Sequence, residues 1–249
     1  MKREIAFNPS PRTLELASGE VHVFCTSLDQ PRERMERLVD TLSEEERHRA
    51  GRFRFKKDLD RFVAGRGILR EILGWLLNVK PGELCFSYGS NGKPQLAMSP
   101  GNIFPYFNVA HSGSLAVYAI SPEHEVGIDI ERIRPLGEAE DIAAHFFSKS
   151  EQTQWQSLPA AVKTEAFFNC WVRKEALLKA NGKGIGESLS QVEVFFDSNL
   201  FSGAEFTLRS LLLPVRDHVA AVAVKCRDPL ISCWHSMPGE CFSDLNFSH

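Results

Sequence analysis

The chain has 249 residues, of which 43% are hydrophobic and 24% charged, as expected for a soluble globular protein of one large or two small domains. The net charge of −3 argues against a protein that coats nucleic acid. The first residues lack the apolar run of a signal peptide, and no segment approaches the length of a membrane span. We therefore expect a cytoplasmic protein that binds neither nucleic acid nor a membrane.

The first half of the chain contains one segment of helical periodicity and three strand-like runs. Alternating runs rich in β-branched residues predict strands, and apolar residues spaced by three or four predict a helix. The predicted helix is Arg61–Leu77, and the strands are Val21–Ser27, Phe107–Ala110 and Leu115–Ile120. Ahead of the helix, Ser43 and Glu46 have the spacing of a capping box, which predicts another helix start.

The same kinds of signal restart after residue 125. The predicted helices are Ser148–Trp155 and Thr164–Ala180, and the strands are Val126–Ile130, Val192–Phe196, Phe206–Leu213 and Val219–Val224. Each half thus holds a long helix, a glycine-rich turn and strands in one order, which indicates an internal repeat. We predict an α+β fold of two similar halves in a pseudo-twofold arrangement, residues 1–123 and 124–249, each a small antiparallel sheet packed on a long helix. A ligand cleft is expected between the halves.

Two acids, Asp129 and Glu131, lie two apart in a strand-like run, so their carboxylates point to the same side. Two such anions repel each other unless a cation lies between them, and magnesium prefers oxygen ligands of this kind. The alternative is a solvated strand face on which Arg132 and Arg134 pair with the acids.

A third acid, Glu175, lies in an apolar helix four residues before Lys179, so both side chains share one helix face. One interpretation is a surface salt bridge. The other gives Glu175 to the metal and Lys179 to a phosphate group. The spacing alone does not decide between the two.

Three blocks together resemble the 4′-phosphopantetheinyl transferase family, in the long two-lobed form that activates peptide and polyketide synthetases (the surfactin-synthetase-activating type). The blocks are Val126–Glu131, Phe147–Glu151 and Trp171–Lys179, and their order and separation match the family pattern. Weaker similarity extends the match from about Leu42 to Gly186. The resemblance implies the fold of that family and transfer of the phosphopantetheine arm of coenzyme A to a serine of an acyl or peptidyl carrier protein.

The resemblance implies roles for the acids and for the lysine of the helix. Asp129, Glu131 and Glu175 would bind Mg²⁺ (or Mn²⁺) together with the coenzyme A pyrophosphate, which Lys179 would also reach. Glu175 is the candidate general base, directly or through a metal-bound water. Glu151 matches a family acid that either acts through water or holds the neighbouring helix. The leaving group would be 3′,5′-adenosine diphosphate.

The resemblance places coenzyme A on the first half. Arg49 and Arg61 match positions that grip the ribose 3′-phosphate, with His111 close to them, and Lys93 matches a residue beside the adenine. Two positions depart from the family. Glu46 stands where some relatives carry a phosphate-binding lysine, and Ala110 replaces a serine that commonly precedes the histidine, so we expect altered coenzyme affinity.

The carrier protein would dock through an acidic helix that follows its target serine, against the region Ala143–Trp155 with Lys149. We expect a monomer, because two halves of one chain build the cleft. A non-catalytic coenzyme A binder and a metal-dependent nucleotide hydrolase remain alternatives at this point. Retention of three acids and a lysine favours the transferase over the binder.

Overall fold

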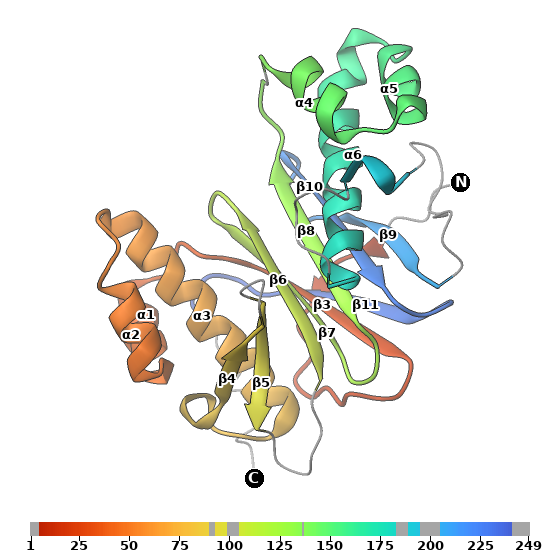
Figure 1. The fold of residues 1–249 in the computed structure, drawn as a ribbon. Coiled ribbons are helices and arrows are strands. Elements are labelled where there is room, and N and C mark those ends of the chain that lie inside the picture. Colours follow the sequence, from red (N-terminus) through yellow and green to blue (C-terminus); the bar gives the residue numbers. More distant parts are fainter. Residues whose placement is uncertain are drawn as a thin grey trace.

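The computed structural model describes residues 5–89, 93–98, 105–135, 137–182, 189–194 and 205–240. These residues form two larger sheets in the middle of the molecule, with one long helix on the outer side of each. A separate two-stranded hairpin lies beside the first of these two long helices (Figure 1). The predicted two-lobed α+β architecture is confirmed. Among the described helices, none has the length and apolar character required to cross a membrane.

The first lobe packs helix α3 (Lys56–Leu77) on a five-stranded sheet. The strands in spatial order are β2 (Asn8–Pro9), β11 (Leu230–His235), β3 (Glu20–Ser27), β7 (Leu115–Ser121) and β6 (Tyr106–Ser112). Two shorter helices, α1 (Arg32–Thr41) and α2 (Glu44–Ala50), precede α3, and the hairpin of β4 (Cys85–Tyr88) and β5 (Pro94–Met98) follows it. The predicted capping box is present at Ser43, which accepts from Glu46 N.

The second lobe packs helix α6 (Ala160–Ala180) on a four-stranded sheet. The strands in spatial order are β1 (Ile5–Ala6), β9 (Thr207–Leu212), β10 (His218–Val224) and β8 (Val126–Arg132). Helices α4 (Ala139–Phe146) and α5 (Lys149–Gln156) lie beyond the first turns of α6 (Figure 1). Ser148 and Glu151 form a second capping box, at the start of α5.

The alternation of side chains along the central strands explains the layering. In β7, Tyr118 and Ile120 pack toward α3, while Val117 and Ala119 enter a core shared with the other sheet. The even-numbered residues of β10 join that shared core, whereas its odd-numbered residues pack with α6. Because successive strand residues point to opposite faces, both sheets are buried on both sides, and the layers run helix, sheet, sheet, helix.

Short segments from the ends of the chain cross between the two lobes. Strand β11 pairs in parallel with β3 of the first lobe, and β1 pairs in parallel with β9 of the second. No helix or strand was predicted for the residues after Pro229, which include β11. Apart from β1 and β11, the strands before residue 124 belong to the first lobe and those after it to the second.

Several boundaries differ from those predicted from the sequence. Helices α3 and α6 begin earlier, at Lys56 and Ala160. His111 and Ser112 were expected between two strands but lie inside β6, because the turn closes at Gly113 with a φ of 61°. Of the strand predicted over 192–196, the described part holds an isolated bridge at Val194, and residues 195–196 lie outside the described residues. Helices α1 and α4 and the β4–β5 hairpin were not predicted.

Gly127 in β8 lets helix α6 lie directly on the strand. A Cβ at this position would come within 2.1 Å of Ala176 O and 2.3 Å of Ala180 N, both in the backbone of α6. No side chain fits there without moving the helix. The glycine therefore sets the distance between β8 and the last turn of α6.

We expect Gly127→Ala to destabilise the fold by roughly 1–3 kcal/mol or more, because the added methyl overpacks a backbone contact. Gly137→Ala is the matched control, since a Cβ at Gly137 meets nothing within 4 Å. Urea unfolding followed by circular dichroism measures both. Equal stability of the two variants would contradict this account of the contact.

Candidate active site

The acid pair Asp129 and Glu131 projects from one face of β8, as the two-residue spacing predicts. The residues between and before them, Ile128 and Ile130, enter the shared core on the opposite face. Asp129 is 7% exposed, and its Oδ2 is buried without a hydrogen-bond partner. A buried carboxylate oxygen with no donor is costly, so the strand presents an unsatisfied anion.

Helix α6 brings Glu175 and Lys179 to the same place. Lys179 Nζ lies 2.6 Å from Asp129 Oδ1 and donates to Ile128 O at 3.2 Å. Glu175 is buried one turn earlier, and its Oε1 also lacks a partner. The ion pair found for Lys179 among the described residues is with Asp129, so the simple salt bridge between Glu175 and Lys179 is not what the structure shows.

The pKa shifts record how the acids crowd one another. The pKa of Glu175 is raised to about 7, first by burial and then by the charges of Asp129 and Glu131, against the attraction of Lys179. Burial likewise raises the pKa of Asp129, against the attraction of Lys179. One lysine therefore does not neutralise this group of acids.

A divalent cation fits the two orphaned oxygens. Carboxylate oxygens are the ligands that Mg²⁺ and Mn²⁺ prefer, and a cation would remove both the missing contacts and the mutual repulsion of Asp129 and Glu175. Within the described part of the chain, no three His, Cys, Asp or Glu side chains stand close enough to form a complete metal cluster. Any cation here would need other ligands, such as water or substrate oxygens.

Strand β6 of the first lobe reaches the acids through polar side chains. Ser112 Oγ donates to Glu131 Oε2 at 3.0 Å, and Asn108 Oδ1 accepts from Ile128 N at 2.9 Å. Side chains therefore bridge β6 and β8 where the two sheets meet. The sequence analysis gave these two residues no role. Asn108 lay in a predicted strand and Ser112 in a predicted turn, and neither position carried a local signal for a contact with the acids.

The basic residues expected to hold a phosphate lie on the first lobe. The pKa of His111 is lowered, first by desolvation and then by the charges of Lys179 and Arg61, while Glu131 opposes the shift. His111 of β6 therefore interacts electrostatically with charged groups of both lobes. Arg61 Nε lies 3.5 Å from Asp29 Oδ1, and the Arg49 guanidinium lies over the ring of Phe62 at 5.4 Å.

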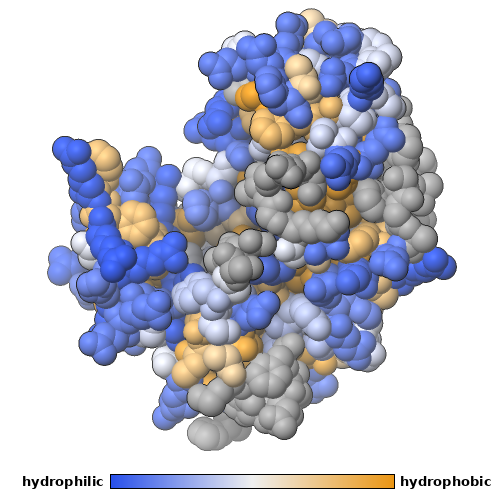
Figure 2. Space-filling model, viewed as in Figure 1, coloured by the Kyte–Doolittle hydropathy of each residue, from blue (hydrophilic) through white to orange (hydrophobic). Residues whose placement is uncertain are grey.

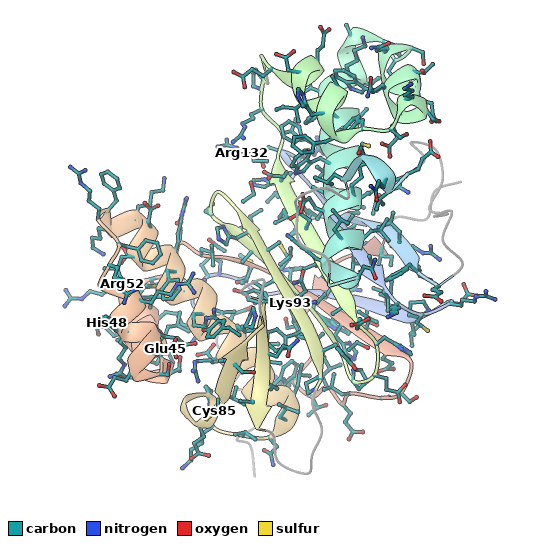
Figure 3. The ribbon with its side chains drawn as sticks, in the orientation of Figure 1. Glu45, His48, Arg52, Cys85, Lys93 and Arg132 are labelled. Carbon is teal, nitrogen blue, oxygen red and sulfur yellow. The ribbon has the colours of Figure 1, made fainter. Side chains whose placement is uncertain are left out.

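Lys93 crosses from the β4–β5 hairpin to the second lobe. Its Nζ donates to Val126 O at 3.2 Å and to Lys179 O at 3.0 Å, and Figure 3 shows it beside the strands at the centre of the molecule. Burial and the charge of Lys179 lower the pKa of Lys93. It also lines a cavity of about 250 Å³ together with Tyr106 and Glu125. The lysine predicted beside the adenine thus also connects the lobes.

Glu151 is fully buried and does not share in the contacts that join the other acids. Its carboxylate accepts from Ser148 N at the start of α5, from Lys174 Nζ at 2.5 Å and from Val194 N at 2.7 Å. These bonds join α5, α6 and the segment around residue 194. Of the two roles the resemblance allowed, this arrangement favours the one that holds the neighbouring helix.

Glu46, which stands where some members of the family carry a phosphate-binding lysine, is also buried. Its side chain caps Ser43 N, bonds to Arg70 Nε at 2.7 Å and lies 3.3 Å from Arg66 Nε. Arg66 in turn lies over the rings of Phe86 and Tyr88. The acid is thus the partner of two arginines within the first lobe, which explains why the position is not basic here.

Comparison with known proteins gives matches over most of the chain. The model of the 4′-phosphopantetheinyl transferase superfamily matches residues 125–223, and that of the 4′-phosphopantetheinyl transferase N-terminal region matches residues 30–123. The 4′-phosphopantetheinyl transferase HetI of Nostoc sp. is 41% identical over 220 residues, which are 87% of this chain and 92% of HetI.

Two relatives from Bacillus are also similar. The transferase psf-1 of Bacillus pumilus is 37% identical over 194 residues, 78% of this chain and 77% of that protein. Sfp of Bacillus subtilis is 30% identical over 169 residues, 67% of this chain and 73% of Sfp.

The shifted pKa of Glu175 predicts a pH-dependent stability for the metal-free protein. The ordinary value is 4.5 and the value in the fold is about 7, so the folded chain binds this proton more tightly than the unfolded chain. The contribution of Glu175 to the free energy of unfolding then falls as the pH rises from about 5 to about 8. Glu175→Gln removes that loss. We therefore expect the free energy of unfolding of this variant to exceed that of the wild type by about 1–3 kcal/mol at the upper pH and to equal it at the lower pH.

Urea unfolding in a chelator at both pH values measures the difference. Excess Mg²⁺ should shrink it, because a bound cation favours the ionised carboxylate. A difference between the two proteins that does not change with pH would show that Glu175 is not the titrating group.

Proposed function

The chain belongs to the 4′-phosphopantetheinyl transferase superfamily, and on this premise we propose that it moves the 4′-phosphopantetheine group of coenzyme A to a serine of an apo acyl or peptidyl carrier protein, releasing 3′,5′-adenosine diphosphate. The observation that carries the proposal is the meeting of Asp129, Glu175 and Lys179 at one point of β8 and α6. Asp129 Oδ2 and Glu175 Oε1 have no hydrogen-bond partner, and Lys179 donates to the other oxygen of Asp129, Oδ1.

No three acidic side chains of the described residues stand close enough to form a metal cluster by themselves, so Asp129, Glu131 and Glu175 would hold the magnesium ion, or manganese in its place, together with water or pyrophosphate oxygens. The ion would supply charge neutralisation at the pyrophosphate and fix its geometry. The carboxylates themselves cannot bind a pyrophosphate, because like charges repel. Lys179 would bind it directly, since its ammonium group already lies at the acid site and stays partly exposed.

In the reaction, the carrier serine oxygen forms a bond to the β-phosphorus of coenzyme A, and the bond from that phosphorus to the bridging oxygen breaks. The bridging oxygen leaves on 3′,5′-adenosine diphosphate, where Lys179 stabilises its negative charge. The serine proton passes to Glu175, directly or through a water molecule. In the metal-free chain the pKa of Glu175 is raised to about 7. A bound cation favours the ionised carboxylate, so Glu175 is available as a proton acceptor but is less basic than that value, and the route through water is the alternative to direct transfer.

We further propose a division of labour between the halves. Residues 1–123 would bind coenzyme A, with Arg49, Arg61 and His111 on its 3′-phosphate and Lys93 near the adenine. Residues 124–249 would hold the metal and the reacting groups. The electrostatic coupling of His111 to both Arg61 and Lys179 supports a ligand that spans the lobes. Glu151 would act as a positioning residue for α6 rather than on the substrate.

The carrier protein would dock beside α4 and α5. Figure 2 shows a hollow between the tip of the first-lobe helices and the α4–α5 region, with hydrophilic side chains along both edges. Lys149 is exposed at the start of α5 and would face an acidic helix. Ala143 and Trp155, the limits of the expected docking region, are buried in the lobe core, so the contact would use the exposed residues between them. One cytoplasmic monomer would suffice, because both lobes supply the site.

Loss of the acids should abolish transfer while the fold remains. We expect Asp129→Ala and Glu175→Ala to lower the rate at least about 10³-fold, since each leaves the pyrophosphate charge uncompensated, and Lys179→Ala to lower kcat by about 10²-fold or more. Glu165→Ala is the control, because Glu165 is an exposed acid on the same helix. Mass spectrometry of an apo-carrier protein incubated with coenzyme A and Mg²⁺ follows the gain of one phosphopantetheine.

Substantial holo-carrier formation by Asp129→Ala or Glu175→Ala would refute the assignment of the acids. Release of adenosine diphosphate by the wild type without a carrier would instead identify a nucleotide hydrolase.

Coenzyme binding can be tested through the 3′-phosphate. We expect Arg61→Ala to raise the KM for coenzyme A by about 10-fold or more, because a charge-assisted contact to phosphate is lost. The same variant should leave the KM for 3′-dephospho-coenzyme A unchanged. Arg32→Ala is the control, since Arg32 is an exposed arginine of the first lobe that pairs with Glu36. Equal losses with both coenzymes would remove Arg61 from the 3′-phosphate site.

A further inference from the structure

Arg132 lies at the end of β8 (Figure 3). At this end a closed set of hydrogen bonds joins β6, β8 and the start of β10. Arg132 N donates to Ser112 Oγ at 3.0 Å, and Arg132 Nε lies 3.1 Å from Asp217 Oδ2. Asp217 Oδ1 lies 2.8 Å from His218 Nδ1, and His218 Nε2 lies 3.3 Å from Ser112 O. We call these four residues, Ser112, Arg132, Asp217 and His218, the polar ring.

One metal-site acid is attached to the polar ring. Ser112 Oγ accepts from Arg132 N, so its hydroxyl hydrogen is left for Glu131 Oε2 at 3.0 Å. A hydroxyl has one hydrogen to donate, and the backbone donor therefore fixes which way it points. The direction of the Glu131 carboxylate follows from this arrangement.

His218 fixes Ser112 from the other side. Its side chain is 6% exposed, and both ring nitrogens face oxygen atoms, the Asp217 carboxylate and the Ser112 carbonyl. This contact lies at the turn between β6 and β7, where Gly113 has a positive φ. His218 packs next to that turn, since its Nε2 would be 3.9 Å from a Cβ placed on Gly113. The second lobe thus holds the end of a first-lobe strand in place.

Glu131 differs in this respect from the other two acids. Asp129 is held by Lys179, and Glu175 is enclosed by its own helix and the sheet. Glu131 is half-exposed, and the one side-chain hydrogen bond found for it among the described residues comes from Ser112. An exposed carboxylate loses more conformational freedom on binding a cation unless a neighbour orients it beforehand.

We propose that Ser112 and His218 are positioning residues that orient Glu131 for the divalent cation, with Ser112 acting directly and His218 through Ser112. The proposal rests on the proposed metal site. It assigns a function to two residues that contact neither the pyrophosphate nor the serine in the mechanism above. It also gives a function to one of the polar links between two sheets that share an apolar core; the others come from Asn108 and Lys93.

The test measures metal binding apart from turnover. Mn²⁺ is titrated into protein saturated with coenzyme A, and the loss of the free-ion electron paramagnetic resonance signal gives the dissociation constant. We expect this constant to rise about 10-fold in Ser112→Ala and by a smaller factor in His218→Ala, because partners of a metal ligand typically contribute 10- to 100-fold to affinity. Ser112→Thr keeps the hydroxyl and should restore binding to near the wild-type value.

Lys225→Ala is the matched control. Lys225 pairs with Glu125 at 2.8 Å and joins the other end of β8 to β10, so its loss removes an interstrand contact without touching Glu131. It should leave the Mn²⁺ constant unchanged. Thermal unfolding of each variant is measured alongside to show that the protein remains folded.

Two results would overturn the inference. The first is wild-type Mn²⁺ affinity in Ser112→Ala. The second is an equal loss in His218→Ala and Lys225→Ala, which would mean that only sheet stability matters. Failure of the proposed function looks different, because the wild-type protein itself would then bind no Mn²⁺ and the metal site would fall together with this inference.

Discussion

The candidate site depends on the close approach of helix α6 to strand β8 over Gly127. With no side chain at that position, the backbone of the last helical turns lies against the strand, and Lys179 and Glu175 reach Asp129 two residues farther along it. Any side chain at Gly127 would push the helix outward and separate the lysine from its partner at 2.6 Å. A glycine that weakens the strand in isolation is therefore what allows acids from two elements to meet.

That meeting has an energetic cost, which the pKa shifts show. Burial and mutual repulsion disfavour ionisation of both Asp129 and Glu175, and a single lysine offsets only part of the effect. Proteins accept such a cost where a ligand later removes it. Lys174, the residue before Glu175 in α6, forms a buried pair with Glu151 that is different. The Glu151 carboxylate already accepts hydrogen bonds from Lys174 and Val194, so it needs no ligand to satisfy it. Neighbouring residues of one helix thus serve ligand binding on one face and structure on the other.

Sequence reasoning recovered what local patterns encode and missed what depends on distant contacts. The capping box at Ser43, the strands of both sheets and the shared face of Asp129 and Glu131 all follow from short-range spacing, whereas the capping box at Ser148 has the same spacing but was not predicted. The pairing of β11 with β3 brings together residues about 210 apart, and no local signal reports it. The resemblance left Glu151 with two possible roles and gave Glu46 only as a departure from the family. Local spacing could not show what buries these two acids, because their partners Lys174 and Arg70 lie on other elements.

The two lobes are joined on both sides of the acid pair, and this shapes how a ligand can act. At the start of β8, Lys93 of the first lobe donates to Val126 O and to Lys179 O; at its end, the polar ring connects Ser112 of the first lobe to His218 of the second. Between them lie the apolar core shared by the two sheets and the hydrogen bond from Ile128 N to Asn108 Oδ1. A close-packed core of this kind resists sliding, so a coenzyme that spans the lobes would find its phosphate-binding groups already set at fixed distances. Binding energy would then go into holding the pyrophosphate and the serine in line, and not into closing the lobes.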